Sequence, residues 1–284
     1  PSAFVNPQHH RPRKRFGQHF LTDETVVTRI AQACARRGQQ TIIEIGPGEG
    51  ALTTALLDAG LAVRAIEVDR DLVPRLRKRF AAADFEVVEA DVLNVDLGDL
   101  ELPTPYTLCG NLPYNISSPL LFHLARWRQD IESMTFMLQK EVVERVLAKP
   151  GGGDYGRLSI MLQLDFVGAH LFDVPPEAFD PPPAVDSSVM QLVPSAEPVD
   201  AALRPALDLL LREAFAQRRK TLRNTLKRRL SGPEIDELGI DSGARPETLG
   251  IEQWLLLASR IKLDSAAQKK TDTTLSPNPD KRLG

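Results

Sequence analysis

The stretch Asn111-Leu112-Pro113-Tyr114 combines residue types that can make a weakly nucleophilic amine react. The exocyclic amino group of a nucleobase is a poor nucleophile because its lone pair is delocalised into the ring. Two oxygens, one from an asparagine side chain and one from a backbone carbonyl, can accept hydrogen bonds from its two N–H groups. They favour a pyramidal nitrogen and stabilise the charge that develops during attack. Pro113 stiffens the loop, and Tyr114 offers a face for a stacked base. Such a turn before a helix is also common without this chemistry, so its context decides.

The neighbouring residues place this motif between a strand and a helix. Tyr106-Thr107-Leu108-Cys109 is an apolar run typical of a buried parallel strand. Ser118 is a good N-cap and Pro119 suits the first helical position, so we expect a helix to begin there. Open α/β sheets bind ligands at the carboxyl ends of their strands. The chemistry is therefore expected at that edge.

Three earlier apolar runs also end in residues suited to ligand binding. The run 41–45 leads into Gly46-Pro47-Gly48-Glu49-Gly50, a turn that lets a cofactor approach the backbone closely. In the second run Glu67 lies 21 residues after Gly46, the interval at which a carboxylate meets ribose hydroxyls. The third run ends at Asp91, which can accept a hydrogen bond from an adenine amino group.

Each of these acids alone is more often a helix cap or a solvated turn. Together with the first motif they mark four successive strand ends, at Gly46, Glu67, Asp91 and Asn111. That layout predicts an α/β, doubly wound, Rossmann-like methyltransferase that uses S-adenosylmethionine. Further strands are expected at 134–138 and near 188–192. The glycine spacing disfavours a nicotinamide oxidoreductase, and the lack of a following lysine excludes a Walker phosphate loop.

Composition limits the class of protein further. The 284 residues suffice for one large α/β domain and a smaller one. No stretch resembles a signal peptide or a membrane span, so no membrane partner is expected. Cys34 and Cys109 stand in apolar surroundings typical of buried free thiols, which suit a reducing compartment. We expect a cytoplasmic monomer without a metal.

Positive charge is concentrated although the net charge is −3. It gathers in residues 11–15 and between Arg212 and Arg229, where eight Lys or Arg stand against Glu213. Such a patch binds phosphates whatever the overall charge. The alternative, a solvated face in a salt-bridge network, lacks nearby acidic partners. The predicted RNA-binding residues are Arg218, Arg219, Lys220, Arg223 and Lys227.

The chain divides by composition. Residues 11–194 are predicted to form the methyltransferase domain and residues 195–263 a helical RNA-binding domain, while 1–10 and 264–284 are expected to be disordered. The apolar run 158–166 fits a helix or a strand. Phe179 stands in a proline-rich loop. Its ring could stack on a flipped base, in a contact worth about 1–3 kcal/mol, or it could pack in the core.

Seven motifs in order give the sequence a resemblance to a known family. They are Lys14-Arg15-Phe16-Gly17-Gln18-His19-Phe20-Leu21, Glu44-Ile45-Gly46-Pro47-Gly48, Glu67-Val68-Asp69, Asn111-Leu112-Pro113-Tyr114-Asn115-Ile116-Ser117, Met137-Leu138-Gln139-Lys140-Glu141-Val142, Tyr155-Gly156-Arg157-Leu158-Ser159 and Phe179-Asp180-Pro181-Pro182-Pro183-Ala184-Val185-Asp186-Ser187. Over roughly residues 11–260 the chain resembles the ribosomal RNA adenine N6,N6-dimethyltransferases of the KsgA/RsmA type.

The resemblance implies a substrate and a cofactor. The substrate would be two adjacent adenosines in the hairpin loop near the 3′ end of 16S rRNA, in an immature small ribosomal subunit. S-adenosylmethionine would be the methyl donor, and the protein would take part in subunit biogenesis. A helix is implied for 158–166.

The resemblance also implies residue roles. His19, Leu21 and Asn111 would contact the cofactor. Gly46 would lie under its methionine part, Glu67 would hold its ribose and Asp91 its adenine. Asn111 and the Leu112 carbonyl would receive the target amine, and Tyr114 and Phe179 would sandwich the base. The family often has Asn at the position of His19.

Two alternatives remain, one with the same chemistry on another RNA and one from a different class of function. Large-subunit rRNA adenine N6-methyltransferases that confer macrolide resistance share the Asn-x-Pro-Tyr motif, but the stretches 155–159 and 179–187 resemble the small-subunit enzymes more. A non-catalytic rRNA-binding assembly factor would not need Asn111, Pro113 and Tyr114 intact.

Overall fold

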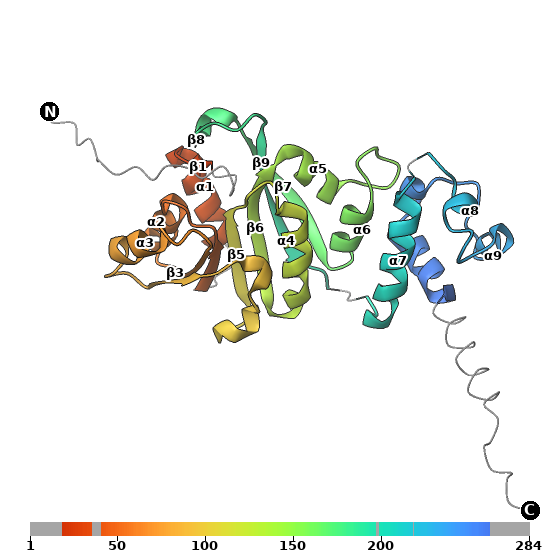
Figure 1. The fold of residues 1–284 in the computed structure, drawn as a ribbon, viewed down its shortest axis with the longest axis horizontal. Coiled ribbons are helices and arrows are strands. Elements are labelled where there is room, and N and C mark those ends of the chain that lie inside the picture. The colour runs from red at the N-terminus through yellow and green to blue at the C-terminus, as the bar shows by residue number, and fades with distance from the viewer. Residues whose placement is uncertain (1–18, 36–40, 197–198, 218, 262–284) are drawn as a thin grey trace, which may run out of the picture. The chain divides into compact units, whose positions relative to one another are not determined.

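The computed structural model describes residues 19–35, 41–196, 199–217 and 219–261. The chain forms two compact units (Figure 1). The first, which we call the sheet unit, comprises Pro1–Leu147 and Asp165–Ala196. The second, the helical unit, comprises Ala148–Leu164 and Glu197–Gly284. Residues 148–164 thus belong to the helical unit, although the sequence pattern places them within 11–194. The predicted disordered ends, 1–10 and 264–284, lie outside the described residues.

The sheet unit is built on seven strands in the order β4-β3-β2-β5-β6-β9-β7. Pairs from β4 to β6 are parallel, whereas β9 is antiparallel to both β6 and β7. The strands are β2 (Thr41–Ile45), β3 (Ala62–Glu67), β4 (Phe85–Glu89), β5 (Tyr106–Asn111), β6 (Ile131–Gln139), β7 (Phe166–Val174) and β9 (Ser187–Pro194). A second, two-stranded sheet pairs β1 (Phe20–Leu21) with β8 (Phe179–Asp180).

Helices connect these strands. In the sheet unit they are α1 (Glu24–Ala35), α2 (Ala51–Asp58), α3 (Val73–Arg79), α4 (Ser117–Leu124) and α5 (Lys140–Leu147), with 3-10 turns at Val92–Asn94, Leu97–Leu100, Ala125–Asp130 and Pro176–Ala178. The central strands β2 and β5 are almost entirely buried because helices cover both faces of the sheet. The chain leaves β2 toward β3 and β4 and then returns to place β5 on the other side of β2. This reversal opens a crevice at the carboxyl ends of β2 and β5.

The predicted α/β fold is confirmed, with a strand at each of the six predicted places. The helix implied for 158–166 is present over most of that range, as α6 (Arg157–Gln163), but Phe166 already belongs to β7. The sequence analysis did not predict β7, whose burial does not follow a simple alternation.

The predicted start of the helix after the motif is wrong. The N-cap of α4 is Ile116, so Ser118 lies inside the first turn. Pro119 is tolerated there because the first N–H groups of a helix have no intrahelical partner. Ser117, which is buried, instead donates its hydroxyl to the carbonyls of Pro113 at 3.1 Å and Tyr114 at 3.3 Å. The helix therefore holds the loop that precedes it.

The helical unit packs around its own apolar core. Its helices are α6, α7 (Arg204–Phe215), α8 (Leu222–Thr225), α9 (Gly232–Glu237) and a helix over 251–261, with 3-10 turns at Ala201–Leu203 and Pro246–Thr248. Trp254 is fully buried among leucines of α7 and α8. The basic stretch 212–229 is not one helix, because α7 ends at Phe215 and only the short α8 follows.

We predict that Gly110→Ala strongly destabilises the sheet unit. Gly110 has φ +155°, and a Cβ there would lie 2.3 Å from the Ile45 carbonyl oxygen in β2. Neither strand of a central parallel pair can move cheaply, so strain and overpacking should lower the free energy of unfolding by roughly 3 kcal/mol or more. Gly153→Ala is the control, because nothing lies within 4 Å of a Cβ there. Urea denaturation measures the free energy of unfolding of both variants. Equal values for Gly110→Ala and Gly153→Ala would contradict the close approach of β5 to β2.

Candidate active site

A cavity of about 270 Å³ opens at the crevice between β2 and β5. We call it the switch-point cavity. Nine of the predicted site residues line it: His19, Leu21, Gly46, Glu67, Asp91, Asn111, Leu112, Pro113 and Tyr114. The strand tips that the sequence pattern singled out therefore meet in one place. Phe179 is not among the lining residues.

The glycine turn after β2 forms the floor of the cavity. Gly46 and Gly48 have φ values of +67° and +58°, which L side chains rarely adopt. The nearest atom to a Cβ on Gly46 would be the Asn111 carbonyl oxygen at 3.9 Å. The turn thus brings bare backbone to the cavity beside the tip of β5, which leaves space for a ligand.

Glu67 links the tip of β3 to this turn. One carboxylate oxygen accepts from the Gly48 N–H at 3.2 Å and the other from the Asp69 N–H at 2.8 Å. Burial raises the pKa of Glu67, while these hydrogen bonds oppose the rise. Each oxygen of a carboxylate has two lone pairs, so Glu67 retains acceptor capacity for a pair of hydroxyls.

Asp91 both caps a turn and faces the cavity. Its side chain accepts from the Leu93 N–H at 3.0 Å and from the Asn94 amide at 3.2 Å. The capping role that the sequence left open is therefore present, and it fixes the carboxylate at the cavity wall.

Glu44 is a cavity residue that the sequence analysis did not select. It is 1% exposed in β2 and accepts a hydrogen bond from the Thr53 hydroxyl at 2.6 Å. Burial raises the pKa of Glu44 to about 7, the Thr53 hydrogen bond opposes this, and the charge of Glu67 adds to it. One charged residue in an otherwise apolar strand was the signal that could have identified it.

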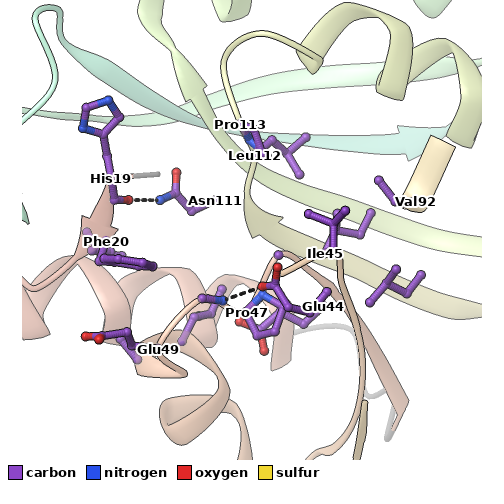
Figure 2. A pocket seen from close by; sticks show the side chains of 18 of the residues that line it. His19, Phe20, Glu44, Ile45, Pro47, Glu49, Val92, Asn111, Leu112 and Pro113 are labelled. Carbon is purple, nitrogen blue, oxygen red and sulfur yellow. Dashed lines mark hydrogen bonds between the residues drawn. The ribbon is translucent and has the colours of Figure 1, made fainter. Parts of the chain in front are cut away.

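Asn111 is held by the chain segment that enters β1. Its amide nitrogen donates to the His19 carbonyl oxygen at 2.9 Å (Figure 2). Because the NH2 end of the amide is bound, the oxygen is the end left to accept from a ligand. The Leu112 N–H donates to the Met137 carbonyl at 3.1 Å, which ties the next peptide to β6.

Tyr114 stands at the rim of the cavity with its hydroxyl anchored. The hydroxyl lies 2.7 Å from the Ser187 hydroxyl, and burial raises the pKa of Tyr114. The His19 ring is stacked on the Tyr114 ring, with centroids 5.7 Å apart and planes 23° from parallel. The structure thus brings an amide, a phenol ring and an imidazole ring together.

Phe179 lies in the core of the sheet unit. Its side chain is 4% exposed and packs in the apolar cluster that includes Leu21, Val27 and Cys34. The structure therefore places it in the second of the two positions that the sequence left open. Its proposed stacking on a base stays a prediction.

The chemistry of the cavity walls favours a cationic ligand. Among the described lining residues are four carboxylates, Glu44, Glu49, Glu67 and Asp91, and one guanidinium, that of Arg79. Arg79 donates to the Glu49 carbonyl at 2.6 Å and to the Thr54 hydroxyl at 3.0 Å, so its hydrogen bonds are directed to the protein. S-adenosylmethionine, with its ammonium and sulfonium groups and its ribose hydroxyls, fits these walls.

The doubly wound sheet, the acidic cavity at its switch point and the solved structures that share the fold define the class: the protein is an S-adenosylmethionine-dependent methyltransferase. The family model described as ribosomal RNA adenine dimethylase matches residues 9–263, and the chain belongs to that family.

Individual relatives agree with this assignment. The chain is 49% identical over 252 residues to the ribosomal RNA small subunit methyltransferase A of Laribacter hongkongensis, covering 88% of this chain and 96% of the relative. It is 50% identical over 255 residues to that of Pseudomonas aeruginosa, covering 89% and 95%.

Two solved structures share the fold. A dimethyladenosine transferase from Plasmodium falciparum has a TM-score of 0.72 at 26% identity and covers 87% of this chain and 98% of its own. The 23S rRNA methyltransferase ErmE has a TM-score of 0.65 at 30% identity, with coverages of 85% and 99%.

We predict that Glu44 makes the sheet unit less stable as pH rises. The pKa of an unfolded glutamate lies near 4, whereas burial in the fold raises the pKa of Glu44 to about 7. Between these values the folded state retains a proton that the unfolded state has lost. The free energy of unfolding should therefore fall, by up to about 3 kcal/mol, relative to Glu44→Gln.

Urea denaturation of both proteins from about pH 4 to pH 8 measures this difference. Glu141→Gln, which removes an exposed carboxylate on α5, is the control. A wild-type minus Glu44→Gln difference that is constant with pH would contradict the prediction.

Proposed function

We propose that this protein transfers methyl groups from S-adenosylmethionine to N6 of two adjacent adenosines in the 3′-terminal hairpin loop of small-subunit rRNA. The observation that carries the proposal is the fixed Asn111 amide, whose nitrogen is bound to the His19 carbonyl and whose oxygen remains for an amine. The names of the relatives, which are small-subunit rRNA methyltransferases, support this substrate.

The residues of the chain position and polarise the reacting amine. The cofactor supplies an activated methyl group on a sulfonium when bound. Asn111 Oδ1 and the Leu112 carbonyl oxygen each accept a hydrogen bond from one N–H of the target amine. This orientation turns the nitrogen lone pair toward the methyl group. The proton that the methylated nitrogen loses passes to solvent, so no strong general base is needed. Pro113 keeps the two acceptors at a constant spacing.

The remaining cavity residues hold the cofactor in this proposal. Glu67 accepts from the ribose hydroxyls with the acceptor capacity that Gly48 and Asp69 leave open. Asp91 accepts from the adenine amino group, Gly46 lies under the methionine part, and Leu21 supplies apolar contact.

An unpaired loop is the form of RNA that suits this cavity. Extruding a base from a loop costs less than from a duplex, because little pairing and stacking is lost. We infer that the natural substrate is the hairpin within an immature small subunit.

The two buried free thiols, Cys34 and Cys109, support a reducing compartment such as the cytoplasm. In the described part of the chain no helix is long and apolar enough to cross a bilayer.

The helical unit supplies the charge for RNA binding in this proposal. Arg219, Lys220, Arg223 and Lys227 are exposed, and Arg218 lies outside the described residues. Two other cations of the stretch are neutralised, since Arg212 pairs with Asp208 and Arg229 pairs with Glu213 at 3.0 Å. The exposed cations available for phosphates are therefore Arg219, Lys220, Arg223, Lys227 and Arg228, of which the first four were predicted from the sequence.

We predict that Asn111→Ala binds S-adenosylmethionine like the wild type but loses roughly 10²- to 10³-fold in turnover. Removing one acceptor leaves the amine unpolarised while the cofactor contacts remain. Methyl incorporation into small subunits lacking these modifications measures turnover, and mapping of the methylated adenosines tests the substrate.

The control is Asn115→Ala, an exposed asparagine of the same loop, which should retain turnover. Unchanged turnover of Asn111→Ala would contradict the mechanism. Methylation of large-subunit rRNA by the wild type instead would favour the large-subunit alternative, and the 23S rRNA methyltransferase ErmE shares the fold at 30% identity.

We predict that replacing Arg219, Lys220, Arg223 and Lys227 by Ala weakens RNA binding. The slope of log affinity against log salt concentration should fall by roughly three, because about four phosphate contacts are lost. Filter binding at several salt concentrations measures this, and cofactor binding should be unchanged. Replacing Arg212 and Arg229, whose charges are already paired, should change the slope less per residue. An unchanged affinity would mean that the patch serves another role.

A further inference from the structure

Arg79 is the one Lys or Arg side chain among the described residues that line the switch-point cavity. It is the last residue of α3, and it is exposed. Its Nη1 donates to the Glu49 carbonyl at 2.6 Å and its Nη2 donates to the Thr54 hydroxyl at 3.0 Å. A guanidinium carries five N–H groups, so these two bonds leave others that can donate to a ligand.

The packing of α3 holds this guanidinium beside the glycine turn. A Cβ on Gly50 would lie 2.8 Å from the ring of Phe80, the residue after Arg79, so the end of α3 touches the turn. Phe80 is buried and packs in an apolar cluster with Val73 and Leu76 of the same helix. The Arg79 guanidinium carbon lies 5.1 Å from the centroid of the Phe80 ring. The positive charge is therefore held at one wall of the cavity.

The proposed cofactor contacts direct the methionine end of the cofactor toward this wall. In that arrangement adenine lies at Asp91, and the methionine part lies over the glycine turn. Figure 2 shows Glu49 and Val92 on opposite sides of Pro47. Val92 follows Asp91 in the sequence, and the Glu49 carbonyl is the one that Arg79 binds. A ligand that begins with adenine beside Asp91 and crosses the turn therefore ends on the side of Arg79.

We propose that Arg79 binds the α-carboxylate of the methionine part of S-adenosylmethionine. This inference rests on the proposed function for the direction in which the cofactor lies. The carboxylate is the one anionic group of the cofactor. Among the described lining residues it meets four carboxylates, which repel it, and one guanidinium, which attracts it. Charge-assisted hydrogen bonds from a guanidinium to a carboxylate are among the strongest in proteins. Arg79 therefore selects ligands that carry the amino-acid tail over those that lack its carboxylate.

A purely structural role of Arg79, as a brace for the glycine turn, makes a different prediction. Arg79 links Glu49 in the turn to Thr54 in α2, and the Gly48 N–H of the same turn binds Glu67. Loss of a brace would disturb the turn and with it the ribose contact, so every ligand that contains adenosine would bind more weakly. Loss of a carboxylate contact would weaken only ligands that carry the carboxylate.

Two ligands separate these roles. One is S-adenosylmethionine, and the other is its decarboxylated form, which keeps the adenosine, sulfonium and ammonium groups and lacks only the carboxylate. Calorimetry without RNA gives both dissociation constants for the wild type, Arg79→Gln and Arg79→Lys. The wild type should bind S-adenosylmethionine roughly tenfold more tightly than the decarboxylated ligand. Arg79→Gln should bind both alike, and Arg79→Lys, which keeps the charge, should retain most of the preference.

Lys78→Gln is the control, because Lys78 is an exposed cation one residue earlier and is not among the lining residues. It should bind both ligands like the wild type. Equal weakening of both ligands in Arg79→Gln would reduce Arg79 to a brace, and a preference that survives in Arg79→Gln would assign the carboxylate to other donors. Either result, or a wild type without any preference, overturns the proposal. A wild type that shows the preference but methylates no small-subunit rRNA would contradict the proposed function and leave the carboxylate contact standing.

Discussion

The close approach of β5 to β2 at the switch point is the constraint on which the site depends. At Gly110 the two backbones are so near that a Cβ would lie 2.3 Å from the Ile45 carbonyl oxygen. Because of this, Gly46 follows β2 directly beside Asn111 at the end of β5, with only 3.9 Å between a Cβ on Gly46 and the Asn111 carbonyl. In the proposed function the methyl donor lies at the first tip and the target amine at the second, so packing of the sheet sets the distance between them.

The cavity also has an energetic cost for the fold. Glu44 and Glu67 are carboxylates at the ends of apolar strands, and burial raises the pKa of each. Groups of this kind oppose folding when ionised, and they are retained where a ligand makes use of them. Hydrogen bonds from Thr53 to Glu44 and from Gly48 to Glu67 offset part of the cost. The same carboxylates make the site attractive to a cation.

The sequence predicted the strands and their tips well because a central parallel strand must be apolar on both faces and must end where the chain becomes polar. It placed the start of α4 wrongly because Ser118 is a good N-cap by residue type, whereas the N-cap in the fold is Ile116 and the Ser117 hydroxyl donates to loop carbonyls instead. It left Phe179 open for a related reason. Pairing of β1 with β8 sets Phe179 opposite Leu21, and nothing local indicates which way the ring then points.

The contacts that hold the side chains of His19, Asn111 and Tyr114 are long-range, which is why no single motif contains them. His19 reaches Asn111 and Pro181, and Tyr114 reaches Ser187, across separations of 92, 162 and 73 residues. In the sequence the proline-rich stretch was selected for its one aromatic residue, Phe179. In the fold the Pro181 carbonyl and the Ser187 hydroxyl make its contacts to the site. Prolines restrict the backbone between these two anchors, so the stretch serves as a stiff spacer that fixes two rings contributed by other segments.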